Sequence, residues 1–139
     1  MSIKEFMNQA FELDHFIKAK QEELDELRER AKSIPTVDYS RERVQGGERS
    51  DRVANTAAAI VDLERAITAD IEDYFRVKGE IYDVIESVEK PRLKLILQLR
   101  YANFKKWEQI QDIVEITDLR YLFRLHNIAL DEAEKNRPA

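Results

Sequence analysis

Apolar residues recur along residues 3–33 at alternating spacings of three and four, the period of one face of an α-helix. Ser2 followed by Glu5 matches a capping box, so we expect this helix to run from about Ile3 to Ser33. Only Lys20 interrupts the apolar face. The face consists of Ile3, Phe6, Ala10, Leu13, Ile17, Leu24, Leu27 and Ala31. A repeat of this length is typical of a long helix that packs in coiled-coil fashion.

A second apolar stripe predicts a helix from about Arg52 to Val88. The stripe consists of Val53, Ala57, Ile60, Leu63, Ile67, Ile71, Tyr74, Val77, Ile81, Val84, Ile85 and Val88. A helix with one apolar stripe must bury it against a partner, and the simplest partner is the first helix, in an antiparallel hairpin. The start of the first helix would then lie beside residues 74–88. We expect a core there, shared with the C-terminal segment.

Residues 34–51 break both patterns and are expected to form the loop of the hairpin. Pro35, Gly46 and Gly47 punctuate a largely polar stretch. A loop of this length is usually mobile or functional. Its candidate phosphate contacts are Arg41, Arg43, Arg49 and Arg52. Acidic residues alternate with these arginines, which favours a solvated surface instead.

The segment after Glu89-Lys90-Pro91 is predicted to contain three short helices. Proline suits the first position of a helix, so the first of the three is expected over residues 91–101. A connection over residues 102–106 leads to a helix on which Trp107, Ile110 and Val114 share a face. Oxygens of Thr117 and Asp118 can cap the next helix. On that helix Leu122, Leu125 and Ala129 share a face.

The predicted fold is therefore all-α: a long antiparallel helical hairpin over residues 1–90, followed by a small three-helix helix-turn-helix domain over residues 91–139. The layout of the last two helices is the one a DNA-binding helix-turn-helix needs. Its second helix offers its N-terminal turn to base edges.

Charge divides along the same boundary. Residues 1–91 carry 14 Lys and Arg against 21 Asp and Glu, a net charge of −7, and residues 92–139 carry 9 against 7, a net charge of +2. The total of −5 argues against a nucleic-acid binder that works by bulk charge, and it allows one with a local basic face. No apolar run is long enough to span a membrane, and the first residues lack a secretory signal. We therefore expect a cytoplasmic protein.

Neither the composition nor the motifs indicate an enzyme. The chain has no Cys and two His, His15 and His126, which are far apart in sequence, so no zinc site is expected. No glycine-rich phosphate loop, nucleophile elbow or HExxH motif occurs. Trp107 is expected to anchor a helix in the core, His126 to pack locally and His15 to be exposed. We expect no metal, no cofactor and no catalytic activity.

The stretch LILQLRYANFKKWEQIQDIV, followed by DLRYLFRLHNIALDEA, resembles region 4 of primary sigma factors. More closely, it is similar to small phage and prophage transcription regulators with a sigma-region-4-like C-terminus, related to the RinA and ArpU types of late-gene regulator. The ordered set LRY, WEQI and RLHxxAL carries this resemblance. The hairpin segment IVDLERAITADIEDYFRVKGEIYDVIESVEKP is similar as well. The resemblance implies binding to promoter DNA as a double strand, and it leaves open a contact with RNA polymerase.

The resemblance also implies roles for individual residues. Asp118 takes the cap position of the recognition helix, and the residues after it take the first-turn positions that face bases. Residues 124 and 127 would flank the DNA backbone, and the lysines before the first helix would approach a phosphate. The candidate DNA-binding residues are Lys105, Lys106, Thr117, Leu119, Arg120, Tyr121, Arg124 and Asn127.

Two positions depart from the usual helix-turn-helix pattern. Gln111 stands where a small residue lets the two helices approach, with its polar end free to bend outward, and Glu115 stands where Gly is usual. A non-glycine residue in a left-handed turn costs roughly 1–2 kcal/mol, and Glu115 would bring negative charge close to DNA. These departures support a second hypothesis, a helical protein-interaction or oligomerisation module with a degenerate helix-turn-helix. The sequence is compatible with a monomer and with a homodimer formed through the hairpin.

Overall fold

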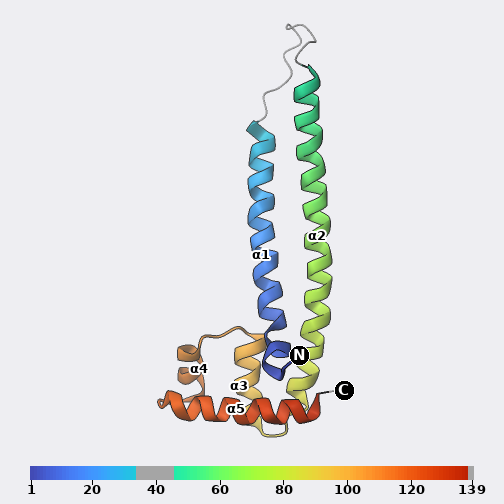
Figure 1. The fold of residues 1–139 in the computed structure, drawn as a ribbon. Helices are drawn as coiled ribbons and strands as arrows, with labels where there is room; N and C mark the ends of the chain where they lie inside the picture. The colour runs from blue at the N-terminus through green and yellow to red at the C-terminus, as the bar shows by residue number, and fades with distance from the viewer. Residues whose placement is uncertain (34–45, 138–139) are drawn as a thin grey trace. The chain divides into compact units, whose positions relative to one another are not determined.

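The computed structural model describes residues 1–33 and 46–137, and within these ranges all regular structure is helical. The all-α prediction is therefore confirmed. The elements are α1 (Ile3–Ser33), α2 (Gly46–Glu86), α3 (Pro91–Leu97), the π-helical turn η2 (Gln98–Ala102), α4 (Trp107–Val114) and α5 (Leu119–Asn136) (Figure 1).

The start and end of α1 are where the sequence predicts them. The Ser2 hydroxyl accepts the Glu5 backbone N–H at 3.1 Å, which is half of the expected capping box. Pro91 occupies the first turn of α3, also as expected.

The helix α2 begins earlier than the predicted start at about Arg52. It begins at Gly46, inside the segment expected to be a loop, so residues 46–51 are helical. The apolar stripe fades there, but backbone hydrogen bonds do not require a stripe, and no proline occurs between residues 36 and 90 to stop the helix. The rest of that expected loop, with Arg41 and Arg43, lies outside the described residues.

The single helix predicted over residues 91–101 is also corrected, because the hydrogen-bonding pattern of this segment changes along its length. It is α-helical to Leu97 and continues as η2 to Ala102. The backbone N–H of Asn103 donates to the carbonyl of Gln98 at 3.0 Å, the wide hydrogen-bonding pattern of a π turn. Asn103–Lys106 then connect to α4, and Phe104 in this connection has a positive φ of 57°.

The chain divides into two compact units. Unit 1 comprises Met1–Asp14 and Asp73–Ala139, and unit 2 comprises His15–Glu72. The predicted boundary between residues 90 and 91 falls between α2 and α3, and it stays a prediction. The start of α1 and the end of α2 belong to unit 1, together with the C-terminal helices.

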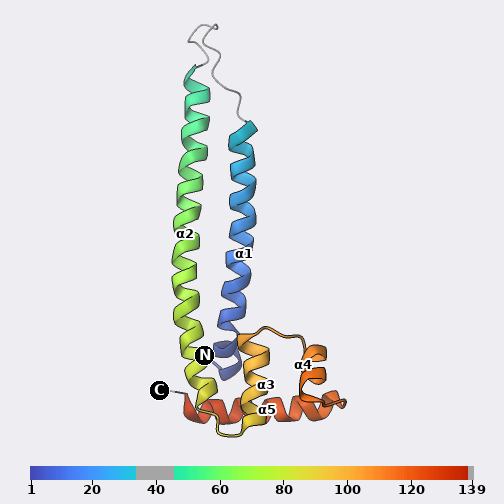
Figure 2. The same ribbon diagram turned by 180° about the vertical axis from the view of Figure 1, so that it is seen from behind.

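In unit 2, α1 and α2 lie side by side and antiparallel (Figures 1 and 2). Ion pairs join Lys20 to Asp70 and Arg28 to Glu64. Residue numbers that increase along α1 are thus paired with residue numbers that decrease along α2, as in an antiparallel pair. Lys20, which interrupts the apolar face of α1, thus finds a carboxylate partner on α2. The buried apolar residues of this unit are Ile17, Leu24 and Ile67.

Unit 1 contains two hydrophobic clusters. The first joins the start of α1, the end of α2, α3, η2 and the second half of α5, as the sequence led us to expect for a shared core. Met7, Ile81 and Ile85 in this cluster are completely buried. The second cluster holds α4 against α3 and the start of α5, and consists of Ile96, Leu99, Ile110, Val114, Ile116 and Leu122. Figure 2 shows α3 and α4 both standing on the same side of α5.

Candidate nucleic-acid interface

The turn between α4 and α5 is tight and left-handed. Glu115 adopts φ 57° and ψ 43° and donates its backbone N–H to the carbonyl of Gln111. The N–H of Ile116 donates to the same carbonyl at 3.1 Å. The turn therefore forms at the position where Gly is usual, at the conformational cost expected for a non-glycine residue.

Gln111 stabilises this turn. Its side-chain amide donates to the carbonyl of Thr117 at 3.1 Å, which spans the turn from α4 to the residue before the α5 cap. The side chain is half-buried rather than bent fully outward. The larger residue at this position thus supplies a hydrogen bond across the turn, which a small residue could not supply.

Asp118 caps α5. Its Oδ1 accepts the backbone N–H of Arg120 at 3.0 Å, as the sequence predicts for an N-cap residue. Thr117, the other candidate cap, is exposed and contributes its carbonyl to Gln111 instead. The first turn of α5 is therefore fixed at its start by one side-chain hydrogen bond.

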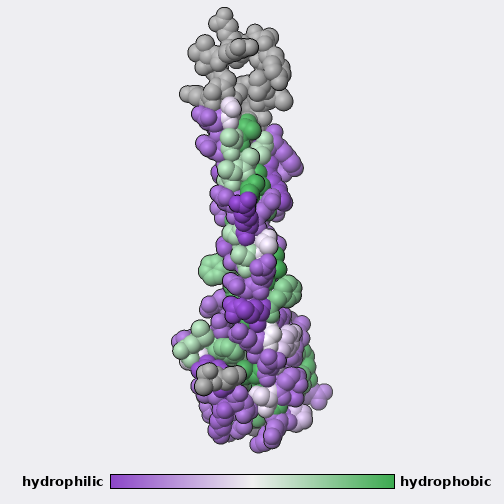
Figure 3. Space-filling model, turned by 90° about the vertical axis from the view of Figure 1, so that its right-hand side faces the viewer, coloured by the Kyte–Doolittle hydropathy of each residue, from purple (hydrophilic) through white to green (hydrophobic). Residues whose placement is uncertain are grey.

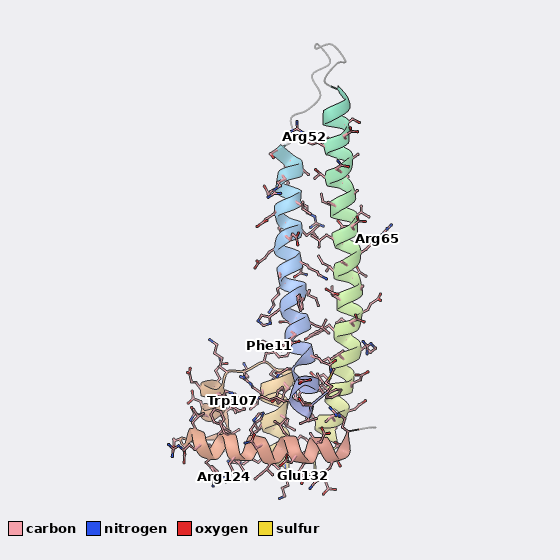
Figure 4. All side chains as sticks on the ribbon, in the orientation of Figure 1. Phe11, Arg52, Arg65, Trp107, Arg124 and Glu132 are labelled. Carbon is pink, nitrogen blue, oxygen red and sulfur yellow. The ribbon has the colours of Figure 1, made fainter. Side chains whose placement is uncertain are left out.

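The buried and exposed faces of α5 are distinct. Its buried residues are Leu122, His126, Ala129, Leu130 and Ala133. At 100° per residue, Arg120, Tyr121 and Arg124 lie on the opposite, exposed side. Figure 4 shows Arg124 on the side of α5 that is turned away from α4. Trp107 lies on the opposite side of α5, toward α4.

The two arginines on this face have no acidic partner in the part of the chain that the structure describes, residues 1–33 and 46–137. In particular, Asp118 and Glu115 do not pair with Arg120 or Arg124. Leu119 and Tyr121 beside them are 40% and 44% exposed. The first turns of α5 therefore present two unpaired cations with apolar and aromatic neighbours.

The other candidate residues lie elsewhere on unit 1. Lys106 precedes α4, and its backbone N–H donates to Gln109 Oε1 at 3.0 Å. The carbonyl of Lys105 accepts Arg100 Nη1 at 3.1 Å, and Lys105 is half-buried. Asn127 is exposed on α5, about 60° around the helix from Arg124, and it also lines a hollow with Trp107. The structure thus places Leu119, Arg120, Tyr121, Arg124 and Asn127 on α5, and it places Lys105 and Lys106 in the connection before α4.

Acidic side chains occupy the exposed part of α4. Glu108, Asp112 and Glu115 are all exposed, beside the apolar Ile113, which is 48% exposed. A phosphate backbone that crossed α4 would meet these carboxylates, so the electrostatics favour contact through α5 over contact through α4.

Behind the exposed face, Tyr101 and His126 form a buried polar pair. The Tyr101 hydroxyl and His126 Nε2 are 2.7 Å apart. Burial raises the pKa of Tyr101 to about 12, so the hydroxyl stays protonated. Burial, with smaller contributions from the positive charges of Lys4 and Arg100, lowers the pKa of His126 to about 4, so the imidazole is neutral at pH 7. The expected local packing of His126 is thus confirmed.

Trp107 anchors α4 through its ring contacts. Its indole meets the rings of Phe123 and His126 edge to face, at 5.1 and 4.7 Å between centroids, and the Arg100 guanidinium lies 4.7 Å from the indole centroid. Trp107 packs against the second cluster while remaining partly exposed.

Reasoning from the sequence missed three residues on or near this part of the molecule. Ile128 shares the outer face of α5 and is 41% exposed; its spacing of four from Arg124 was the available signal. Arg100 was part of the LRY motif but had no role assigned to it. Lys4, in the first turn of α1, gave no signal, because only the tertiary fold brings it near His126.

The described residues contain neither a metal-binding cluster nor a membrane-spanning helix. Across residues 1–33 and 46–137, no group of three or more His, Asp or Glu side chains is arranged to hold a metal ion. None of the helices in those ranges combines the length and apolar character needed to cross a lipid bilayer.

Comparison with known proteins places the chain in one family. No curated protein and no solved structure matches it. Residues 33–134 of the 139 match the family described as "Protein of unknown function (DUF1492)", a match that includes all of α2, α3, η2 and α4 and the part of α5 up to residue 134. The chain therefore belongs to the DUF1492 family.

Proposed function

We propose that the protein is a phage-type transcription regulator that binds promoter DNA through the outer face of α5. The observation that carries this proposal is the pair of exposed arginines, Arg120 and Arg124, without acidic partners in the described residues. They lie in the first two turns of a capped helix that follows a tight helix-turn-helix. The resemblance of this segment to sigma region 4 supports the same assignment.

The residues on this face suit different parts of a DNA duplex. Arginine recognises guanine in the major groove and also binds phosphates, while Leu119 can contact the methyl group of thymine. The basic surface is small, so we expect about three to six phosphate contacts per subunit and a modest dependence of affinity on salt. The exposed Tyr121 and Ile128 on the same face would suit a protein surface, which keeps RNA polymerase as a proposed second partner.

Selection from a library of random duplex DNA, at low and at moderate salt, tests this proposal. We expect an enriched sequence motif with the wild-type protein. The Arg120→Ala/Arg124→Ala variant should lose the motif and bind the selected site at least roughly tenfold more weakly. The matched control is Arg30→Ala/Arg65→Ala, which removes the same charge from exposed positions of unit 2 and should leave binding to the selected site nearly unchanged.

The outcome against the proposal is equally specific. If the two double variants bind the selected site alike, the α5 face does not read DNA. If binding is weak, uniform across sequences and abolished by salt, the protein is not a sequence-reading regulator.

The alternative function is a helical interaction or oligomerisation module. Exposed apolar side chains favour it: Phe75 on α2 is 68% exposed, and Phe16 on α1 is 61% exposed. Figure 3 shows green apolar surface interrupting the hydrophilic surface along the helices of unit 2, where Val53 and Val61 of α2 are exposed. Association through these side chains should persist at high salt, so the mass measured by light scattering over a salt series separates this function from DNA binding.

A further inference from the structure

A hollow of about 320 Å³ opens on unit 1, beside the candidate interface. Its walls come from four elements, α1, η2, α4 and α5. The residues that line it are Lys4, Asn8, Arg100, Tyr101, Trp107, Phe123, His126 and Asn127. The volume lies at the lower end of the range for small-molecule sites, about 300–1000 Å³.

The charge of this hollow has one sign. Among the described residues that line it, two are cations and none is a carboxylate. The Lys4 ammonium forms no ion pair within residues 1–33 and 46–137. Arg100 is held in place by the Lys105 carbonyl and the Trp107 ring, neither of which neutralises its charge. The hollow therefore attracts anions.

The buried polar pair of Tyr101 and His126 lines this hollow together with the two cations. Both Lys4 and Arg100 disfavour the charged form of His126, so their charges act at the imidazole, whose pKa they help to lower. The imidazole and the Tyr101 hydroxyl beside it stay neutral, and so they add hydrogen-bonding groups without adding charge. Two amides, Asn8 and Asn127, supply further donors and acceptors.

The remaining walls are aromatic. Trp107 and Phe123 meet edge to face, and the His126 ring stands at 73° to the indole. Aromatic walls with a few convergent polar groups are typical of sites for planar organic ligands. The two cations and the aromatic rings that line the hollow together favour a ligand with an anionic group attached to a flat ring.

We propose that this hollow binds a small organic anion in which a carboxylate or phosphate is attached to a planar ring system. Lys4 and Arg100 bind the anionic group, while Trp107 and Phe123 contact the ring. The carboxylate and phosphate forms share this chemistry, and they are distinguished by testing benzoate against adenosine monophosphate. The proposal concerns the protein alone and does not rest on DNA binding.

Trp107 is the one tryptophan of the chain, so its fluorescence reports directly on this hollow. Titration with benzoate and with adenosine monophosphate should give a saturable change for at least one of them, and calorimetry should give the same affinity. Adenosine, which lacks the anion, and inorganic phosphate, which lacks the ring, should bind at least roughly tenfold more weakly.

Two matched lysine variants test the role of charge. Lys4→Gln should weaken binding of the effective probe roughly tenfold, because one charge-assisted contact is lost. Lys90→Gln removes the same charge from an exposed position that does not line the hollow, and should bind like the wild type. Both positions are exposed, so both variants should fold, as circular dichroism will show.

Three outcomes would overturn the proposal. The first is that neither probe binds saturably. The second applies if adenosine monophosphate is the probe that binds, and it is that adenosine binds with the same affinity. The third is that Lys4→Gln and Lys90→Gln bind the effective probe with equal affinity. Because no DNA is present, failure here leaves the proposed function of α5 unaffected, and loss of DNA reading by α5 leaves this site unaffected.

Discussion

The two units are built from the same two long helices but bury their apolar residues to different depths. In unit 1 the helices meet α3, η2 and α5, and Met7, Ile81 and Ile85 are entirely buried. Among the described residues of unit 2, α1 and α2 are the helices that meet, and the best-buried of those residues, Leu24 and Ile67, each remain 7% exposed. Two helices can cover a single seam, whereas additional helices are needed to enclose a core. The candidate interface and the hollow both lie on unit 1.

Truncation of one core residue in each unit should give the largest difference. Ile85→Ala should lower the free energy of unfolding by about 4 kcal/mol, because it leaves a cavity enclosed on all sides. Leu24→Ala should cost about 2 kcal/mol, because its seam is partly open to solvent and can collapse. Urea denaturation of both variants checks this, with amide hydrogen exchange to locate the loosened unit. Equal costs would show that the two units are equally well packed.

Acid should weaken unit 1 selectively. His126 has a pKa near 4 in the folded protein against an ordinary value of 6.5, so between these values the unfolded chain binds more protons. Its contribution to stability is complete above about pH 6.5 and is lost progressively as the pH falls toward 4. From about pH 7 to about pH 5 the loss should be about 2 kcal/mol, measured by urea denaturation at each pH.

A variant of His126 provides the control for this pH dependence. His126→Gln should remove most of it, because the buried imidazole is then absent. A pH dependence that survives in His126→Gln would assign it to other groups.

The ion pair between Lys20 and Asp70 should affect unit 2 alone. The two side chains are 31% and 20% exposed, so removing either one leaves a partly desolvated charge and should cost about 1 kcal/mol. Lys20→Leu combined with Asp70→Leu should be as stable as the wild type or more stable, because it completes the apolar seam. A double variant less stable than both single variants would mean that the pair holds the two helices in register. Denaturation with hydrogen exchange distinguishes these results.

The smallest expected effect comes from the turn of unit 1. Glu115→Gly should stabilise the protein by about 0.5 kcal/mol, since relief of the left-handed backbone slightly exceeds the entropy gained by the unfolded chain. Phe104 has the same φ of 57°, but its ring meets Phe11 at 5.7 Å and packs on the core, so Phe104→Gly should destabilise. Thermal unfolding of the two variants should shift in opposite directions, and a shift in the same direction would contradict this account.

Local signals in the sequence were enough to predict several elements. Ser2 and Glu5 mark the start of α1, Pro91 marks the start of α3, and Asp118 caps α5, because each acts through hydrogen bonds or sterics within a few residues. The buried face of α5 followed from the spacing of Leu122 and Ala129. These features depend on the chain itself and not on what packs against it.

Features that depend on tertiary contacts were not predictable in the same way. No apolar stripe in the sequence indicated that α2 starts at Gly46. The spacing of apolar residues over 91–101 likewise gives no sign of a π turn. The hollow joins Lys4 to Arg100 and His126, which are distant in sequence and individually unremarkable. The grouping of α5 residues by face required the helix packing that the structure supplies.

The π turn η2 has a consequence for how members of the family are aligned. A π turn accommodates one residue more than the α turn it replaces, so loss of one residue would close it to an α turn and shift the residues within it by about 100° around the helix. Arg100 and Tyr101 lie within this turn, so a relative one residue shorter here would carry them on a different side of the helix. A single-residue gap among residues 98–102 would therefore separate DUF1492 proteins that keep the tyrosine–histidine pair from those that do not.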